Sequence, residues 1–81
     1  MAKHSWFVKM RVYENTPATD GGVNSILHNT IYFNDNGRYR VSDGEKYKYF
    51  TDYSKAQDYA IRSSLPLFPS GHSTMEAIEL A

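Results

Sequence analysis

Residues 27–50 carry the clearest alternation of apolar and polar positions in the chain. Three short runs with a period of two are separated by two glycine-containing segments, a pattern typical of antiparallel strands joined by tight turns. If residues 35–37 form a three-residue loop, Phe33 pairs with Tyr39 and the apolar side chains gather on one face. Gly37 supplies the left-handed conformation that such a loop needs.

A second loop of the same kind is predicted at residues 42–44, which read Ser-Asp-Gly. It places Tyr39 opposite Tyr47, so that the rings of the neighbouring strands lie on the same face. The predicted sheet core is therefore Leu27, Ile31, Phe33, Tyr39, Val41, Tyr47 and Tyr49.

The opposite face of this predicted sheet is basic. Arg38 lies opposite Lys48 in the same register. Arg40 lies opposite Lys46. Like charges on neighbouring strands destabilise a sheet by energies on the order of a few tenths of a kcal/mol. The face is therefore either a solvated surface with edge-protecting cations or a site for an anionic partner.

Residues 4–13 alternate in the same way and predict the first strand of the sheet. In that position Lys9 and Arg11 add to the basic face. The predicted partner-binding residues are Lys9, Arg11, Tyr32, Arg38, Arg40, Lys46 and Lys48.

A helix is predicted at about residues 53–65, with Thr51 or Ser54 as its N-cap. Its small and apolar positions form a stripe that favours packing on the apolar face of the sheet, which leaves the basic face open. The predicted fold is a single α+β domain over residues 1–81. It contains an antiparallel sheet of about four strands, built from the three-strand meander and the N-terminal strand.

The remaining segments have weaker patterns. Residues 14–25 combine Pro17, two glycines and small polar side chains, which indicates a loop whose length favours a functional or mobile role. Residues 65–69 contain two prolines and are expected to be extended. Residues 73–81 fit either a short helix or a terminal strand that pairs beside the first strand.

The length and composition bound the class of protein. A chain of 81 residues has room for one small core, which is compatible with a homodimer or a larger assembly. It has no cysteine, no signal-like apolar segment and no run long enough to cross a membrane. We expect a soluble cytoplasmic protein. The formal net charge of zero argues against strong non-specific binding to nucleic acid.

The string Phe68-Pro69-Ser70-Gly71-His72 resembles the P-S-G-H motif of the phosphatidic-acid phosphatase and vanadium haloperoxidase superfamily. In that family the Ser and Gly backbone helps to bind phosphate, and the His is the general acid. The chain departs from the family pattern elsewhere, because it has no Arg-Pro and no histidine after His72. The family is also an all-helical bundle of far greater length. Phosphatase-like chemistry at residues 69–72 is therefore a remote alternative, and an exposed proline-glycine turn explains the string.

No other pattern predicts catalysis or a cofactor. The histidines His4, His28 and His72 lack the spacing of metal ligands, and no paired carboxylates lie in an apolar setting. We expect a protein that is not an enzyme and needs no metal.

Recognition of a macromolecule remains. In size and strand-helix pattern the chain resembles the small cysteine-free inhibitors that phages and mobile elements encode, including anti-CRISPR proteins. The resemblance implies a non-enzymatic protein-directed inhibitor or modulator that occupies a functional surface of a host protein. The expected partner is a host protein or complex with an acidic surface. The alternative is a nucleic-acid-binding module, because aromatic residues alternate with cations at residues 38–40 and 46–50.

Overall fold

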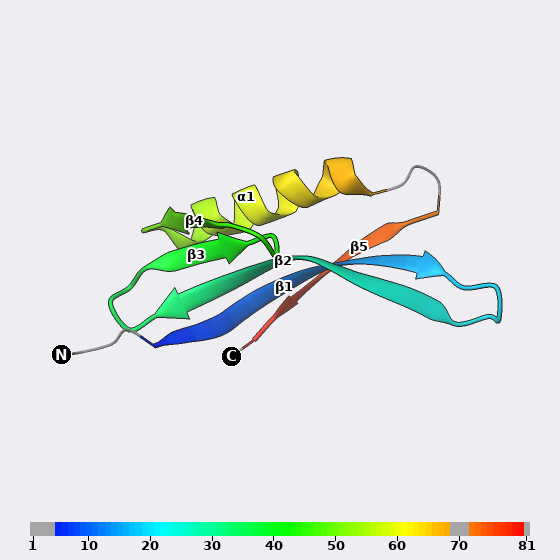
Figure 1. Ribbon diagram of the computed structural model, residues 1–81, viewed down its shortest axis with the longest axis horizontal. Helices are drawn as coiled ribbons and strands as arrows, with labels where there is room; N and C mark the ends of the chain where they lie inside the picture. The colour runs from blue at the N-terminus through cyan, green and yellow to red at the C-terminus, as the bar shows by residue number, and fades with distance from the viewer. Residues whose placement is uncertain (1–4, 69–71, 81) are drawn as a thin grey trace.

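The computed structural model describes residues 5–68 and 72–80 and contains one antiparallel sheet with an α-helix beside it (Figure 1). The α+β class with an antiparallel sheet is confirmed, although the described sheet has five strands rather than about four. The helix α1 (Tyr53–Ser64) and a short 3-10 helix (Leu65–Leu67) lie between the last two strands in the chain. The strands are β1 (Trp6–Pro17), β2 (Val23–Asn34), β3 (Tyr39–Ser42), β4 (Tyr47–Phe50) and β5 (Thr74–Glu79).

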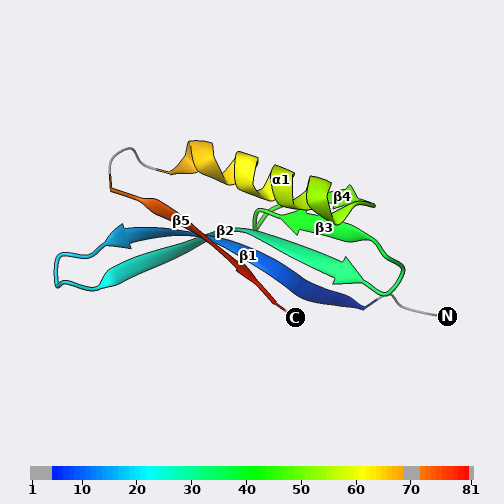
Figure 2. The same cartoon turned by 180° about the vertical axis from the view of Figure 1, so that it is seen from behind.

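The order of strands across the sheet is β4-β3-β2-β1-β5, so that β4 and β5 form its two edges. The distal part of the β1–β2 hairpin projects beyond α1 (Figures 1 and 2). The molecule is consequently elongated, with extents of 51 × 22 × 21 Å.

This hairpin corrects the prediction of a loop at residues 14–25, most of which belong to β1 or β2. Asn15 pairs with Ser25, whose hydroxyl donates a hydrogen bond of 2.6 Å to Oδ1 of Asn15. The connecting turn is closed by the N–H of Ala18, which donates to the carbonyl of Gly22 at 2.9 Å. Alternation of apolar residues indicates burial on one face, and a strand that is polar on both faces therefore lacks this signal.

The register predicted for β2 and β3 is confirmed, including the pairing of Phe33 with Tyr39. Gly37 has a φ of 78°, which is the left-handed conformation that its loop requires. Oδ1 of Asn34 accepts the N–H groups of Asn36 and Arg38 at 3.0 Å each and holds the loop closed.

The register predicted for β3 and β4 was wrong. The two strands are connected by residues 43–46 rather than by residues 42–44, so that Tyr39 pairs with Phe50 instead of Tyr47. The change in register is an odd number of residues. Every side chain of β4 therefore lies on the face opposite to the one predicted.

The hydrogen bonds of Asp43 explain this longer connection. Its carboxylate accepts the N–H groups of Glu45 at 2.9 Å and Lys46 at 3.0 Å. Its own N–H donates to the carbonyl of Lys46 at 3.3 Å. Asp43 and Lys46 thus close a turn around Gly44, which has a φ of 97°, and Glu45.

The core lies between the sheet and α1, and the predicted core is correct only in part. Ile31 and Val41 are buried, whereas Phe33 and Tyr39 are half-buried. Leu27 is 48% exposed, because the extra residue His28 in β2 interrupts the alternation. Tyr47 and Tyr49 are 50% and 55% exposed, as the corrected register requires. The buried apolar cluster is Met10, Val12, Ile31, Val41, Ala56 and Ala60, with Tyr39, Phe50 and Tyr53 packed against it.

Helix α1 begins after Asp52, whose carboxylate accepts the N–H of Ser54 at 3.0 Å. Asp52 is therefore the N-cap, and the predicted caps Thr51 and Ser54 were wrong, because aspartate caps a helix as well as serine does. No helix in the described part of the chain has the length and apolar character needed to cross a membrane. The buried residues of α1 are Ala56, Ala60 and Ser64.

The structure after α1 can be compared with the predictions for residues 65–69 and 73–81. Residues 65–67 form a 3-10 helix rather than an extended segment, because Pro66 fits the first turn of a helix. Of the two alternatives for residues 73–81, the strand is the one observed, since β5 pairs antiparallel with β1. The predicted Pro-Ser-Gly-His string lies outside the described residues at positions 69–71.

A candidate binding surface around strand β4

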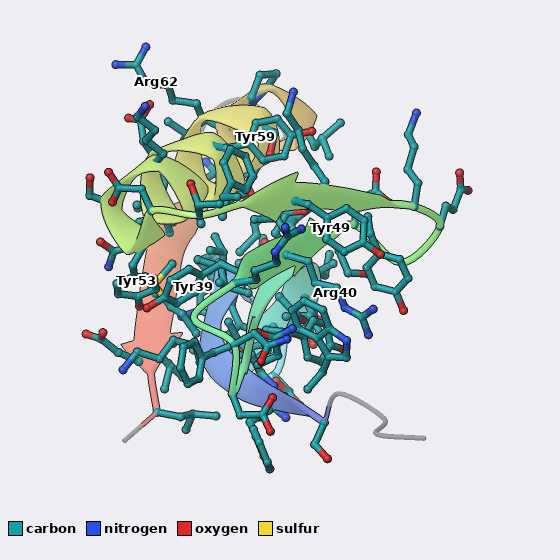
Figure 3. The ribbon with its side chains drawn as sticks, turned by 90° about the vertical axis from the view of Figure 1, so that its left-hand side faces the viewer. Tyr39, Arg40, Tyr49, Tyr53, Tyr59 and Arg62 are labelled. Carbon is teal, nitrogen blue, oxygen red and sulfur yellow. The ribbon has the colours of Figure 1, made fainter. Side chains whose placement is uncertain are left out.

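Strand β4 separates two surfaces of the molecule. Tyr47 and Tyr49 point to the side of the sheet away from α1, where they lie near Arg40. Lys48 points to the other side, with Nζ 5.0 Å from the ring centroid of Tyr59 in α1. Figure 3 shows Arg40 and Tyr49 on the side away from Tyr39 and Tyr53.

The first surface is an aromatic platform formed around one guanidinium group. Cζ of Arg40 lies 4.1 Å from the ring centroid of Tyr47 and 4.2 Å from that of Trp6. The ring centroid of Tyr32 is 5.3 Å away. These distances are typical of cation-π contacts, which hold the guanidinium in one orientation. The aromatic platform is defined here as Trp6, Tyr32, Arg40, Tyr47 and Tyr49.

The rings of the aromatic platform also contact one another. The centroids of Trp6 and Tyr49 are 6.1 Å apart in an edge-to-face arrangement, and those of Tyr32 and Tyr47 are 6.5 Å apart. Tyr47 and Tyr49 remain about half exposed. The platform therefore combines ordered rings with a large accessible aromatic area.

Arg40 has neither a hydrogen-bond partner for its Nε nor an ion pair in the described part of the chain. This Nε is buried. The charge of this guanidinium is therefore not neutralised by a carboxylate of the described residues, and an acidic group of a partner would complement it.

The second surface is a groove between β4 and α1. Two adjoining hollows of about 310 and 630 Å³ make up most of the groove, and it continues at the end of β4 into a third of about 290 Å³, which Arg38 and Tyr49 also line. The first two hollows share Lys48 and Tyr59, and the last two share Phe50 and Lys55. The basic side chains that line this cationic groove are Arg38, Lys46, Lys48, Lys55 and Arg62.

The cationic groove is positively charged overall, although two acidic side chains also line it. Asp58 accepts a hydrogen bond of 2.8 Å from Nε of Arg62, and this exposed pair neutralises one cation. Asp43 lies in the β3–β4 turn, where the backbone N–H groups of Lys46 and Glu45 hold the pKa of its carboxyl below the ordinary value.

The structure distributes the predicted partner-binding residues over several surfaces rather than one basic face. Tyr32 and Arg40 belong to the aromatic platform, while Arg38, Lys46 and Lys48 line the cationic groove. The face with like-charged pairs does not form, because its cross-strand pairs depended on the wrong register.

The two cations predicted on β1 make none of the described contacts that define the aromatic platform or the cationic groove. Arg11 pairs with Thr30 in β2, on the side of the sheet opposite Met10. Lys9 lies on the helix side, 3.8 Å from Glu79 and 5.4 Å from the ring centroid of Tyr53.

Several residues of the two surfaces were not singled out by the sequence pattern. Tyr47 and Tyr49 were assigned to the core, and the lysine-tyrosine alternation at 46–50 fits either face. Lys55 and Arg62 have helical spacing on α1, but their position over β4 depends on packing that no local pattern indicates. Trp6 lies in the strand predicted at residues 4–13, where the alternation indicates no role in binding.

A third cluster lies under the segment that follows α1. Glu14 is 1% exposed and accepts hydrogen bonds from Nε2 of His28 at 2.7 Å and from the hydroxyl of Ser73 at 2.6 Å. The hydrogen bonds from Ser73 and His28 lower the pKa of Glu14 below its ordinary value. Ser73 donates to the carboxylate and not to the histidine, which is a structural arrangement rather than that of an activated nucleophile. Residues 5–68 and 72–80 contain no group of three or more ligands that could hold a metal.

Comparisons with protein-family models, curated proteins and solved structures find no match. The function is therefore inferred from the geometry of these surfaces.

Proposed function

We propose that the protein is a non-enzymatic binding protein that covers part of the surface of a protein partner with its aromatic platform. The observation that carries this proposal is the guanidinium of Arg40, which lies against the rings of Trp6 and Tyr47 without an ion-pair partner among the described residues.

The composition of the platform supports a protein partner. Tryptophan, tyrosine and arginine are the residues that contribute most binding energy in protein interfaces. Tyrosine provides a large contact area at a low cost in conformational entropy. The ring contacts of Tyr47 and Tyr49 further restrict their motion before a partner binds. Such preorganisation lowers the entropic cost of association.

Charge also favours a protein over nucleic acid. The chain has no net charge, and the aromatic platform contains one cation, Arg40. Nucleic-acid binding depends mainly on several phosphate contacts from basic side chains. An inhibitory role of the kind found in small phage and mobile-element proteins is compatible with this proposal, because a non-enzymatic binding protein acts on its partner by covering it.

A single-stranded nucleic acid is the second candidate. The corrected register places Tyr47 and Tyr49 on the same side as Arg40, and rings beside a cation are able to stack on bases.

The proposal is tested by affinity capture from a lysate of the organism in which the protein occurs, with and without nuclease. The wild type is expected to retain a defined protein that survives nuclease treatment. The double variant Tyr47→Ala/Tyr49→Ala is expected to lose it, since both rings are at least half exposed and their removal spares the core. The control Ile26→Ala removes a 50% exposed side chain on the hairpin and should retain the partner.

Two results contradict the proposal. If nuclease abolishes capture, the nucleic-acid candidate replaces it. If the double variant retains the partner as well as Ile26→Ala does, the aromatic platform is not the contact surface. Circular dichroism of each variant verifies that the fold is intact.

A further inference from the structure

We propose that the partner presents an extended acidic segment of polypeptide, which adds as a further strand beside β4 and lies along the cationic groove. This inference rests on the proposed function, because it names the part of the protein partner that β4 recognises. It concerns the edge of the sheet and the groove, whereas the proposed function concerns the aromatic platform.

Strand β4 is an edge strand of the sheet, so one side of its backbone faces no neighbouring strand. In an antiparallel pair, every second residue directs its N–H and C=O to the neighbouring strand. The bond from the N–H of Asp43 to the carbonyl of Lys46 belongs to the same register and sets this alternation. Lys48 therefore bonds to β3, while Tyr47 and Tyr49 direct their backbone groups outward, where an added strand is able to pair with them.

The surface next to this edge is hollowed. The hollows of about 310 and 630 Å³ lie between β4 and α1 and are lined from both elements, including Lys48 and Tyr59. Side chains of a strand alternate between its two faces. An added strand would therefore direct every second side chain into the groove and the others toward the aromatic platform.

The charge of the groove favours an acidic segment. Lys46, Lys48 and Lys55 line the groove and form no ion pair within residues 5–68 and 72–80. These ammonium groups complement carboxylates at alternate positions of an added strand. They also disfavour pairing of β4 with β4 of a second copy, because such pairing brings lysines together.

The other edge of the sheet provides an internal contrast. Strand β5 is exposed along its whole length and contains Glu76 and Glu79. Its carboxylates repel an acidic strand. The charges therefore direct such a segment to β4 rather than to β5.

The test measures fluorescence anisotropy of labelled probes with the full chain. The acidic probe is a peptide of about eight residues in which glutamate alternates with threonine or valine, a length typical of a strand. Its counterpart has lysine in place of glutamate, and a third probe is an oligothymidine of about twelve nucleotides. The wild type is expected to bind the acidic peptide at least about tenfold more tightly than the lysine peptide.

A pair of substitutions at Tyr49 tests the backbone contact. Tyr49→Pro removes the outward N–H, and proline is tolerated at such a position of an edge strand. Tyr49→Ala removes the same ring but keeps the N–H. We expect Tyr49→Pro to bind the acidic peptide about tenfold more weakly than Tyr49→Ala.

A second pair tests the charge. Lys48→Gln/Lys55→Gln removes two cations from the groove, and Lys9→Gln removes a cation that lies near Glu79 and outside the groove. The first variant is expected to lose about tenfold in affinity, and the second to stay within about threefold of the wild type. The emission of Trp6 and circular dichroism verify that each variant is folded.

Three results overturn the inference: no binding of the acidic peptide at about 1 mM, equal binding by Tyr49→Pro and Tyr49→Ala, or binding of oligothymidine in its place. These failures are separable from a failure of the proposed function. A partner that is captured by the wild type and lost by Tyr47→Ala/Tyr49→Ala supports the platform, even if the acidic peptide does not bind. If the acidic peptide does not bind and no partner is captured in this way, both proposals are contradicted.

Discussion

The hydroxyl of Ser73 donates a hydrogen bond of 2.6 Å to Oε2 of Glu14, a residue with 1% of its surface exposed. The other carboxylate oxygen accepts from Nε2 of His28 at 2.7 Å. Since Ser73 immediately precedes β5, this carboxylate connects the start of the C-terminal strand to β1 and β2.

Glu14 is expected to make the stability of the fold depend on pH. Its pKa in the folded state is below the ordinary value of 4.5, mainly because of the hydrogen bonds from Ser73 and His28. A lowered folded-state pKa stabilises the protein at pH values above the unfolded pKa, and this contribution is lost as the pH falls through the folded pKa. The free energy of unfolding, measured in urea between about pH 3 and pH 7, should therefore fall below about pH 4.5.

Two variants test whether Glu14 is responsible. Ser73→Ala removes the largest cause of the lowered pKa and should reduce the pH dependence. Thr19→Ala removes a hydroxyl from the exposed turn of the β1–β2 hairpin and should leave it unchanged. An equal effect of the two substitutions would contradict the role of the buried contact.

Asn29 is expected to be important for the attachment of α1 to the sheet. Its side chain is buried, and Nδ2 donates to the carbonyl of Ala60 at 3.0 Å and to Oγ of Ser64 at 2.7 Å. Asn29→Ala removes these contacts, together with one of 3.0 Å to Oγ of Ser63, from the buried contact between β2 and α1, so the free energy of unfolding should fall by about 1–3 kcal/mol. The control Asn24→Ala affects an exposed position of β2 and should change the value by less than about 0.5 kcal/mol. Urea unfolding followed by circular dichroism measures both.

The N-cap of α1 predicts that substitutions at the adjacent residues Thr51 and Asp52 have different effects on stability. The carboxylate of Asp52 accepts the N–H of Ser54, so Asp52→Ala should destabilise the fold by about 0.5–2 kcal/mol. Thr51→Ala should have little effect, because Thr51 lies before the cap. If Thr51→Ala destabilises the protein more than Asp52→Ala does, Asp52 is not the cap.

The two β-turns around β3 explain how much of the sheet follows from local sequence. Gly37 is the last residue of the loop at residues 35–37. Only one register of β2 and β3 brings Phe33 and Tyr39 to the same face as the other apolar side chains, so this register could be predicted from the sequence. In residues 43–46 the carboxylate of Asp43 accepts backbone N–H groups across a longer connection. The pattern of apolar positions does not predict this contact, because the contact is made by a polar side chain with the backbone.

The aromatic platform and the cationic groove were hard to predict because their side chains fit more than one environment. Tyrosine is compatible with the core and with a contact surface, so the alternation at 46–50 fits both registers. Lys48 faces α1 although it is charged, because the residue stays exposed and its Nζ lies over the ring of Tyr59, 5.0 Å from the centroid. The cationic groove further requires Lys55 and Arg62 of α1 to lie over β4, which depends on the tertiary packing of the helix.

Arg40 is expected to order the aromatic platform in the absence of a partner. Its guanidinium lies 4.2 Å from the ring centroid of Trp6, the one tryptophan in the chain, so that tryptophan emission reports on this contact. Arg40→Gln removes the cation-π contacts and should make Trp6 more accessible to quenching by acrylamide, with a loss of about 0.5–2 kcal/mol in the free energy of unfolding.

The matched substitution is Arg38→Gln, which removes an exposed guanidinium from the neighbouring part of the chain. It should leave both the quenching of Trp6 and the stability near the wild-type values, because no cation-π contact of Arg38 with Trp6 occurs in the described structure. If Arg40→Gln leaves the quenching unchanged as well, the platform is ordered by contacts between its rings. Preorganisation would then depend on the rings of Trp6 and Tyr49, whose centroids lie 6.1 Å apart, and Tyr49→Ala, which keeps the tryptophan as the reporter, would be the substitution that separates the two contributions.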